Sequence, residues 1–225
     1  MIRIATKKEN EYYSKKLYPV QDEIFKLIPS DKFYLTGGTC LSRFYYNHRY
    51  SDDLDFFFDG KKYSKGTFEK ECDQIRNIIS GKFKIINVLD DEYFKRIIVV
   101  RENVELKIEF IFEPVTTIGK KKSFHNILLD TKENIVANKL TTIYNRKTNK
   151  DYIDLYYLLK EFELEKVQKW ADRKMVPIDY EGTLLCLLDG TFYGDVIMID
   201  KIDLADYELF VKNTIDELIN NARKI

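Results

Sequence analysis

The sequence predicts an α/β protein (α+β in its arrangement) whose mixed sheet is followed by a helical C-terminal region. Strand-like apolar runs recur through the first half of the 225-residue chain and are separated by segments with helical spacing. After residue 163 the apolar residues recur mainly at helical spacing. We therefore expect a core at residues 1–115 with an N-terminal helical cap, and a mainly helical region at residues 116–225.

The composition is that of a globular chain with balanced charge. It has 44% hydrophobic and 33% charged residues, with 37 basic and 37 acidic side chains. A net charge of zero argues against a broadly basic surface that coats nucleic acid, although a local patch can still bind one end of an RNA. The chain shows neither an apolar run of the roughly 18 residues that cross a bilayer nor a secretory signal. We expect a cytoplasmic protein that does not bind membranes.

Cysteine and histidine give little indication of chemistry. Cys40, Cys72 and Cys186 are widely spaced, which supports neither a disulfide framework nor a zinc cluster. We expect Cys40 to be a small apolar helix residue. The two histidines are too few for a histidine metal site. We expect His48 in a solvated loop, with a position flanking the pocket as the alternative.

The predicted elements follow one another in a simple order. Residues 9–29 have helical spacing, and Pro19 is expected to divide them into two short helices. A strand at 33–35, a glycine turn, a short helix and a strand at 54–58 come next. A helix at 65–79 precedes strands at 82–89, 93–101 and 104–112, which indicate a mixed sheet with antiparallel hairpins. Further helices are expected at 130–145, 149–162, 165–174, 180–188 and 205–221.

The glycine turn is a candidate phosphate site. Gly37-Gly38-Thr39 lies between a strand and a helix start, where backbone N–H groups and the helix dipole favour an anion. Glycine also lets a phosphate approach the main chain closely. Taken alone, the same residues are equally those of an ordinary turn with an N-cap.

The strand at 54–58 begins with a candidate metal site. In Asp53-Leu54-Asp55, alternation places both carboxylates on one face and Leu54 on the other. Two neighbouring acids repel each other unless a cation lies between them, and magnesium accepts one or two protein carboxylates plus substrate phosphates. A solvated strand end remains the alternative for an isolated Asp-x-Asp.

Together the two motifs resemble the nucleotidyltransferase superfamily of the DNA polymerase β type. They resemble more closely the AbiEii/AbiGii toxin-like nucleotidyltransferase family, in which Gly-Gly-Thr, a helix and Arg-x-Ser-x-Asp-hydrophobic-Asp form the first motif. The corresponding residues are Gly37, Gly38, Thr39, Arg49, Ser51, Asp53 and Asp55. The resemblance implies that they bind the nucleotide, and that Asp53 and Asp55 bind metal and are catalytic.

Four more positions follow from this resemblance. Glu109 lies mid-strand where the superfamily has a third metal carboxylate, although the face it shares with Lys107 is alternatively a solvated, charge-paired one. Lys139 and Arg146 match a helix with a lysine and a downstream arginine, which implies phosphate contacts for both and a catalytic role for Lys139. Asp151 matches the acid of Arg-Asp-x-x-Asp, which implies a catalytic role, with Lys150 in place of the usual arginine. By composition alone, Lys139 and Asp151 are ordinary helix-surface residues.

The resemblance implies a magnesium- or manganese-dependent enzyme that moves a nucleoside monophosphate from an NTP to an acceptor hydroxyl and releases pyrophosphate. It further implies the toxin of a toxin-antitoxin or abortive-infection system, with tRNA or another RNA as acceptor and a cognate antitoxin as partner. Two alternatives remain: transfer to a protein hydroxyl by the same fold, and a catalytically silent nucleotide-binding module. The C-terminal helices would complete the active site.

Overall fold

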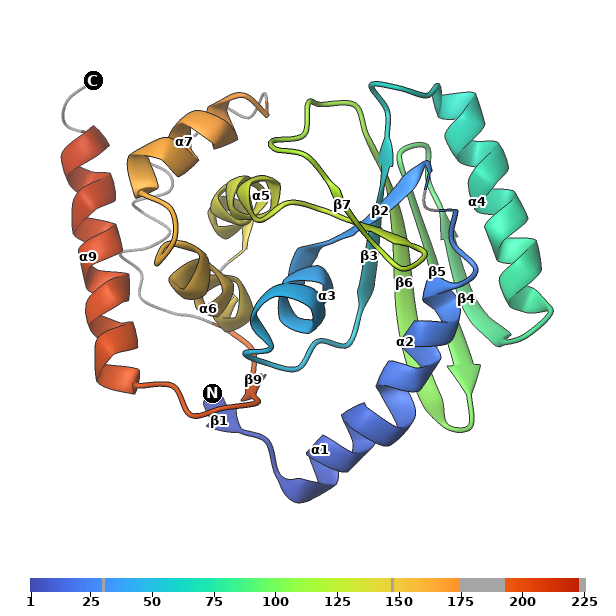
Figure 1. Cartoon of the computed structure of the whole chain (residues 1–225), viewed down its shortest axis with the longest axis horizontal. Coiled ribbons are helices and arrows are strands. Elements are labelled where there is room, and N and C mark those ends of the chain that lie inside the picture. Colours follow the sequence, from blue (N-terminus) through green and yellow to red (C-terminus); the bar gives the residue numbers. More distant parts are fainter. Residues whose placement is uncertain (30, 147, 175–192, 223–225) are drawn as a thin grey trace.

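Figure 1 shows an α/β fold with helices on both sides of a central sheet. The computed structural model describes residues 1–29, 31–146, 148–174 and 193–222. The strands are β1 (Ile2–Ile4), β2 (Phe33–Thr36), β3 (Leu54–Asp59), β4 (Lys84–Asp90), β5 (Phe94–Arg101), β6 (Val104–Glu113), β7 (Lys122–Phe124), β8 (Ile127–Leu129) and β9 (Val196–Met198). The helices are α1 (Lys7–Tyr12), α2 (Tyr18–Phe25), α3 (Gly37–Leu41), α4 (Lys65–Ser80), α5 (Lys132–Asn145), α6 (Asn149–Leu158), α7 (Leu164–Asp172) and α9 (Leu204–Ala222), with π-helical turns η1 (Tyr13–Leu17) and η2 (Ser42–Tyr46). The predicted fold class is confirmed.

The central sheet is mixed, as predicted. Within the described residues its strand order is β4-β5-β6-β3-β2-β8-β7. Strand β3 runs parallel to β6 and β2 parallel to β8, while the other neighbours are antiparallel. Because β8 pairs with β2 at Leu35 and Leu129, the sheet includes chain from both sides of residue 115. A separate parallel pair joins β1 to β9.

The two faces of the sheet differ in chemistry. On β3, Leu54, Phe56 and Phe58 are at most 1% exposed, and Phe56 contacts Phe25 of α2 with ring centroids 6.3 Å apart. Figure 1 shows α2 and α4 together on this side of the sheet. Asp55 alternates with these residues along β3 and therefore lies on the opposite face. One face is a closed apolar core, and the other carries polar side chains.

The break predicted at Pro19 is wrong. Helices α1 and α2 are joined by η1 into one continuous run, and Pro19 lies in the first turn of α2. The first turn tolerates proline because backbone N–H groups there need fewer intrahelical partners. The wider π-helical turn before it, in which Tyr18 N–H donates to the Tyr13 carbonyl, accommodates the proline without ending the helix.

The second half of the chain is mainly helical, with short strands that the sequence did not predict. Helices α5, α6, α7 and α9 correspond to predicted helices, while the helix expected at 180–188 lies outside the described residues. Strands β7, β8 and β9 have three residues each, too few for a pattern of period two to be recognised. In the described part of the chain, no helix is long and apolar enough to cross a membrane.

A buried aspartate fixes the start of α5 beside the glycine turn. Asp130 is fully buried. It accepts hydrogen bonds from Thr36 Oγ1 at 2.6 Å, from Asn134 Nδ2 at 2.9 Å and from Thr131 N–H at 2.9 Å. Thr131 caps α5 by accepting from Asn134 N–H. Since Thr36 directly precedes Gly37, this network holds α5 against the end of β2.

Candidate active site

A cleft of about 380 Å³ lies between the polar face of the sheet and α5. It brings together residues from segments more than 100 positions apart. The sequence-predicted residues that line it are Gly37, Gly38, Arg49, Ser51, Asp53, Asp55, Glu109, Lys139 and Arg146. The other lining residues are Thr36, Phe57, Phe94, Ile111, Ile135, Asn138, Thr141, Thr142 and Lys150. Two predicted site residues, Thr39 and Asp151, do not line the cleft.

Neither glycine of the turn has room for a side chain, because other side chains lie close to its main chain. Gly37 has a φ of +68°, in the left-handed region, and a Cβ at this position would lie 2.6 Å from Asp55 Oδ2. A Cβ on Gly38 would lie 2.3 Å from Arg49 Nη2. The absence of side chains therefore lets Asp55 and Arg49 approach the main chain of the turn.

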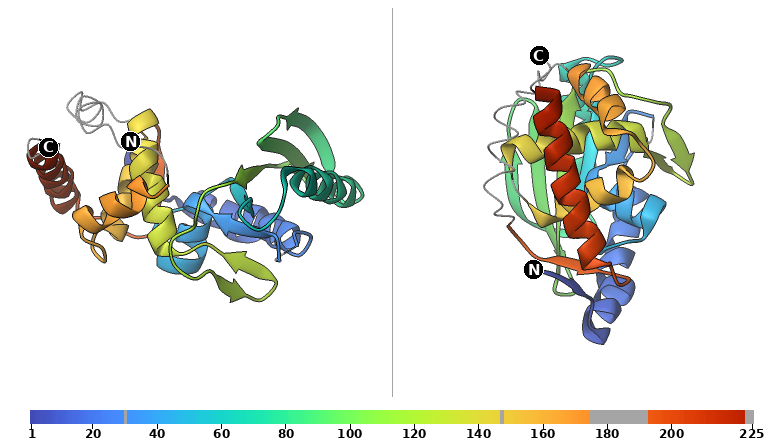
Figure 2. Two further views of the ribbon diagram at one scale, coloured as in Figure 1. Left: turned by 90° about the horizontal axis from the view of Figure 1, so that it is seen from above. Right: turned by 90° about the vertical axis from the view of Figure 1, so that its left-hand side faces the viewer.

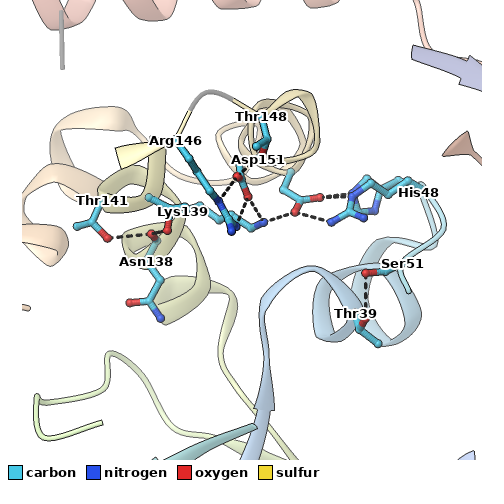
Figure 3. A network of polar contacts seen from close by, with 12 residues as sticks. Thr39, His48, Ser51, Asn138, Lys139, Thr141, Arg146, Thr148 and Asp151 are labelled. Carbon is cyan, nitrogen blue, oxygen red and sulfur yellow. Dashed lines mark hydrogen bonds and ion pairs between the residues drawn. The ribbon is translucent and has the colours of Figure 1, made fainter. Parts of the chain in front are cut away.

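Thr39 acts inside the fold. Its side chain is 1% exposed. Its hydroxyl lies 2.9 Å from Ser51 Oγ, a contact that Figure 3 shows, and is also within hydrogen-bonding distance of the Asp53 carbonyl. Thr39 thus fixes the segment that leads into β3 and sets the position of Asp53. The nucleotide contact predicted for Thr39 itself has no counterpart in the cleft lining.

The acidic wall of the cleft contains Asp53, Asp55 and Glu109. Asp55 is the register partner of Glu109 across the parallel β3–β6 pair, so the two side chains share one face. Lys107 Nζ lies 3.0 Å from Asp53 Oδ2 and 3.2 Å from Glu109 Oε1. Arg96 Nη2 lies 2.6 Å from Glu109 Oε1. Glu109 is therefore paired with two cations, whereas no cation is paired with Asp55 among the described ion pairs.

These contacts give the two register partners opposite pKa shifts. Burial, with repulsion from Glu109 and Asp53, raises the pKa of Asp55 to about 6. Burial also opposes ionisation of Glu109, but Lys107 and the hydrogen bond from Arg96 outweigh it and lower the pKa of Glu109 below its usual value. Asp55 is consequently the carboxylate that gains most from an added positive charge.

The donor set fits a divalent metal at Asp53 and Asp55. Magnesium needs only one or two protein carboxylates when substrate phosphates complete its shell, and the ionised form of Asp55, which burial and the neighbouring Glu109 and Asp53 disfavour, is one that a cation would stabilise. Among the described residues, no three His, Cys, Asp or Glu side chains are arranged to hold a metal ion together. Because Lys107 and Arg96 engage Glu109, its predicted role as a third ligand stays a prediction.

The basic wall of the cleft depends on Asp154. Arg49 donates to it through Nε at 2.7 Å and through Nη2 at 2.8 Å. Lys139 Nζ lies 2.5 Å from Asp154 Oδ2, and His48 Nε2 lies 2.8 Å from Oδ1. Figure 3 shows Lys139 of α5 and His48 of the segment before β3 on opposite sides of this network. The charges of Arg49 and Lys139 keep the pKa of Asp154 well below its usual value despite complete burial.

Asp151 contacts two of the predicted phosphate-binding cations. It is fully buried behind the cleft wall. Lys139 Nζ lies 2.7 Å from Asp151 Oδ1, Arg146 Nε donates to Oδ2 at 2.9 Å, and Thr148 Oγ1 donates to the same oxygen. Burial would raise the pKa of Asp151, but Lys139, Thr148 and Arg146 together lower it. Its carboxylate contacts the cations and is not itself exposed to the cleft.

Sequence reasoning missed several members of this site. Asp154 carried a detectable signal, because it lies three residues after Asp151 and thus on the same side of α6. The solvated loop expected for His48 is wrong: His48 is 3% exposed, and burial lowers its pKa. For Lys107 and Arg96, the sequence showed only the alternation of polar and apolar residues along a strand, which does not indicate a role in the site. Cys40 is fully buried, as expected.

Comparisons relate the chain to known proteins. The family model of the nucleotidyl transferase AbiEii toxin of type IV toxin-antitoxin systems matches residues 22–220. An uncharacterized protein of Aquifex aeolicus (strain VF5) is 26% identical over 224 residues, covering 92% of this chain and 100% of that protein. The crystal structure of JHP933 from Helicobacter pylori has a TM-score of 0.60 at 19% identity, over 94% of each chain. MenT4, a nucleotidyltransferase toxin from Mycobacterium tuberculosis H37Rv, has a TM-score of 0.59 at 15% identity, over 90% of this chain and 82% of MenT4.

A methyl group on the glycine turn should disrupt the site. In Gly38→Ala the new Cβ collides with Arg49 Nη2, which Asp154 holds in place. We expect a loss of about 1–3 kcal/mol in the free energy of unfolding, the usual cost of overpacking, measured by urea denaturation. The matched control is Gly66→Ala on α4, where the nearest atom lies 4.0 Å away. It should be neutral or stabilise the protein by up to about 1 kcal/mol. Equal stability of the two variants would contradict the steric argument.

The stability of the protein should depend on pH through Asp55. Its folded-state pKa of about 6 exceeds the ordinary value of 3.8, so the folded state binds more protons and the free energy of unfolding falls as pH rises between about 4 and 6. Asp55→Asn should remove this fall and be more stable at pH 8 by up to about 3 kcal/mol, at about 1.4 kcal/mol per pKa unit. Urea denaturation at pH 4, 6 and 8 measures it. A variant less stable than the native protein at pH 8 would contradict the assignment.

Proposed function

Since the chain belongs to the AbiEii nucleotidyltransferase toxin family, and is therefore a nucleotidyltransferase, we propose that it is a toxin that transfers a nucleoside monophosphate from an NTP to a hydroxyl of tRNA or another RNA. The family implies an NTP substrate, a divalent metal and a cognate antitoxin. We further propose that the metal is Mg²⁺ or Mn²⁺. A toxin acting on RNA would work in the cytoplasm, where its substrates are.

The observation that carries the proposal is the convergence of three groups on one cleft. Asp53 and Asp55 come from the sheet, Gly37 and Gly38 from the turn after β2, and Lys139 from α5. Carboxylates for a metal, backbone N–H groups for phosphate oxygens and a compact cation for a phosphate are what transfer from a triphosphate needs. A silent binding module has no need for all three.

In the proposed reaction the chain positions substrates and balances charge. A divalent metal bound at Asp53 and Asp55 would neutralise triphosphate oxygens and favour ionisation of the attacking hydroxyl. Lys139 and Arg146 would bind phosphate oxygens from the opposite wall. The N–H groups of Gly37 and Gly38 would also donate to phosphate oxygens. The acceptor oxygen bonds to the α-phosphorus, the bond to the pyrophosphate oxygen breaks, and the hydroxyl proton is released.

The buried acids of α6 keep the cations in place during this reaction. Asp151 and Asp154 stay ionised because neighbouring cations lower their pKa values. Each contacts Lys139, which therefore has a fixed position when a triphosphate arrives. We propose that Asp151 is a positioning residue for Lys139 and Arg146, and that Asp154 has the same role for Arg49. Preorganised charge of this kind is a large part of catalysis in sites that form no covalent intermediate.

Loss of Asp53 should abolish transfer without unfolding the protein. Asp53 is half-buried at the start of β3, so Asp53→Asn should retain the native melting temperature to within a few degrees. We expect NMP transfer to fall at least about 100-fold and growth arrest on expression to disappear. Asp52→Asn, at the adjacent exposed position, is the matched control and should remain active. Growth arrest that persists in a folded Asp53→Asn protein would reject the enzymatic toxin.

The acceptor can be identified with labelled nucleotides. We expect label from one α-³²P-labelled NTP to appear in purified tRNA when Mg²⁺ or Mn²⁺ is added, and to be absent with EDTA. A parallel reaction with a protein extract tests transfer to a side-chain hydroxyl. Label in protein but not in RNA would replace the proposed acceptor and retain the transferase. Label in neither, with a folded protein, would count against the toxin activity on RNA.

A further inference from the structure

The cleft continues beyond its carboxylates into an apolar strip on the sheet. Phe57, Ile111 and Phe94 are register partners on β3, β6 and β5 and are each half-buried in the cleft lining. Asp55, Glu109 and Arg96 form the equivalent row two residues earlier along β3 and β6. At about 3.3 Å per residue, the two rows are about 7 Å apart. An apolar surface thus begins directly beside the proposed metal site.

The dimensions of this apolar row suit a flat aromatic ligand. Adjacent strands lie about 4.8 Å apart, so the row from Phe57 to Phe94 extends about 10 Å across the sheet. Two of its three side chains are aromatic rings, on which a planar π-system can stack. Arg96 lies over the Phe94 ring at 5.1 Å from its centroid, next to the acidic row. Because all three side chains of the row line the cleft, its open surface faces the cleft and not the closed core of α2 and α4.

Asn138 on α5 supplies a polar group to the same cleft. Its Nδ2 is buried, yet among the described residues it has no hydrogen-bond partner. Thr141 and Thr142 hydroxyls donate to the main-chain carbonyl of Asn138 and leave its amide nitrogen unengaged. Figure 3 shows the side chain pointing away from the network around Lys139 and Asp151. A buried donor without an acceptor costs free energy, and a ligand that offers an acceptor removes that cost.

We infer that the apolar row of Phe57, Ile111 and Phe94, together with Asn138, is the site that recognises the base of the NTP. This inference rests on the proposed function. A nucleobase is planar with apolar faces, and its edge carries hydrogen-bond acceptors. It stacks on the aromatic row while the Asn138 amide, which lines the cleft, turns so that Nδ2 donates to a carbonyl oxygen on the edge of the base. The 7 Å between the rows is occupied by the ribose that joins the base to the α-phosphate.

The same geometry predicts which kind of base is preferred. A donor at Asn138 favours a base with a carbonyl oxygen at that edge over its counterpart with an amino group, that is, uracil over cytosine or guanine over adenine. The sugar and phosphates are common to all four NTPs. Asn138 is thus expected to determine which nucleotide is preferred. The aromatic row is expected to contribute affinity for every NTP without distinguishing between the bases.

Binding of the four NTPs, measured by titration calorimetry with Mg²⁺ and without acceptor, tests this assignment. We expect Asn138→Leu to weaken binding of the preferred NTP about 3- to 10-fold and to leave the others nearly unchanged. Asn138→Asp, which offers an acceptor in place of the donor, should shift the preference from the keto base to its amino counterpart. Phe94→Ala should weaken all four NTPs by a similar factor. Asn77→Leu, on the exposed face of α4, is the matched control.

The possible outcomes separate the inference from the function on which it rests. If the native protein binds NTPs and Asn138→Leu and Asn138→Asp retain its base preference, the base site is wrong and the transferase stands. If Asn138→Leu alters only the Michaelis constant for the RNA acceptor, the site binds the acceptor and the inference is overturned. A folded native protein that binds no NTP overturns both. Melting temperatures within a few degrees of the native value show that the variants are folded.

Discussion

The buried ion pair between Arg49 and Asp154 is the constraint on which the rest of the site depends. It joins the segment before β3 to α6 across 105 positions of sequence, and both side chains are almost completely buried. Removing one partner of such a pair leaves an uncompensated charge, at a cost of about 3–5 kcal/mol. Because Arg49 also lies against Gly38, the same pair fixes where the glycine turn is relative to the helices.

This constraint produces a cleft with opposite charges on its two walls. The sheet contributes acids, of which Asp55 has a raised pKa, and the helices contribute cations whose partners are Asp151 and Asp154. A site of this kind would suit the proposed metal at one wall and the proposed polyphosphate at the other.

Local patterns predicted the features that local physics controls. Alternation placed Asp55 opposite Leu54, and the helix predicted at 130–145 corresponds to α5, which Thr131 caps within its own first turn. Predictions failed where a distant segment determines the outcome. His48 was expected in solvent and is buried against Asp154, and Pro19 was expected to break a helix that a π-helical turn continues. Strands of three residues depend on their neighbours in the sheet more than on their own sequence.

The sequence by itself determined the fold class, the two acids on one face of β3, and the glycine turn that precedes them. Each depends on residues a few positions apart, whose relation is set by strand and helix periodicity. Tertiary structure alone decided that Asp154 joins Arg49 to Lys139 and that Lys107 lies between two acids. It also decided that the Asn138 Nδ2 donor has no hydrogen-bond partner in the part of the chain that the structure describes. These facts depend on how elements far apart in sequence pack together. Strand and helix periodicity does not predict which buried charges and polar groups will contact one another.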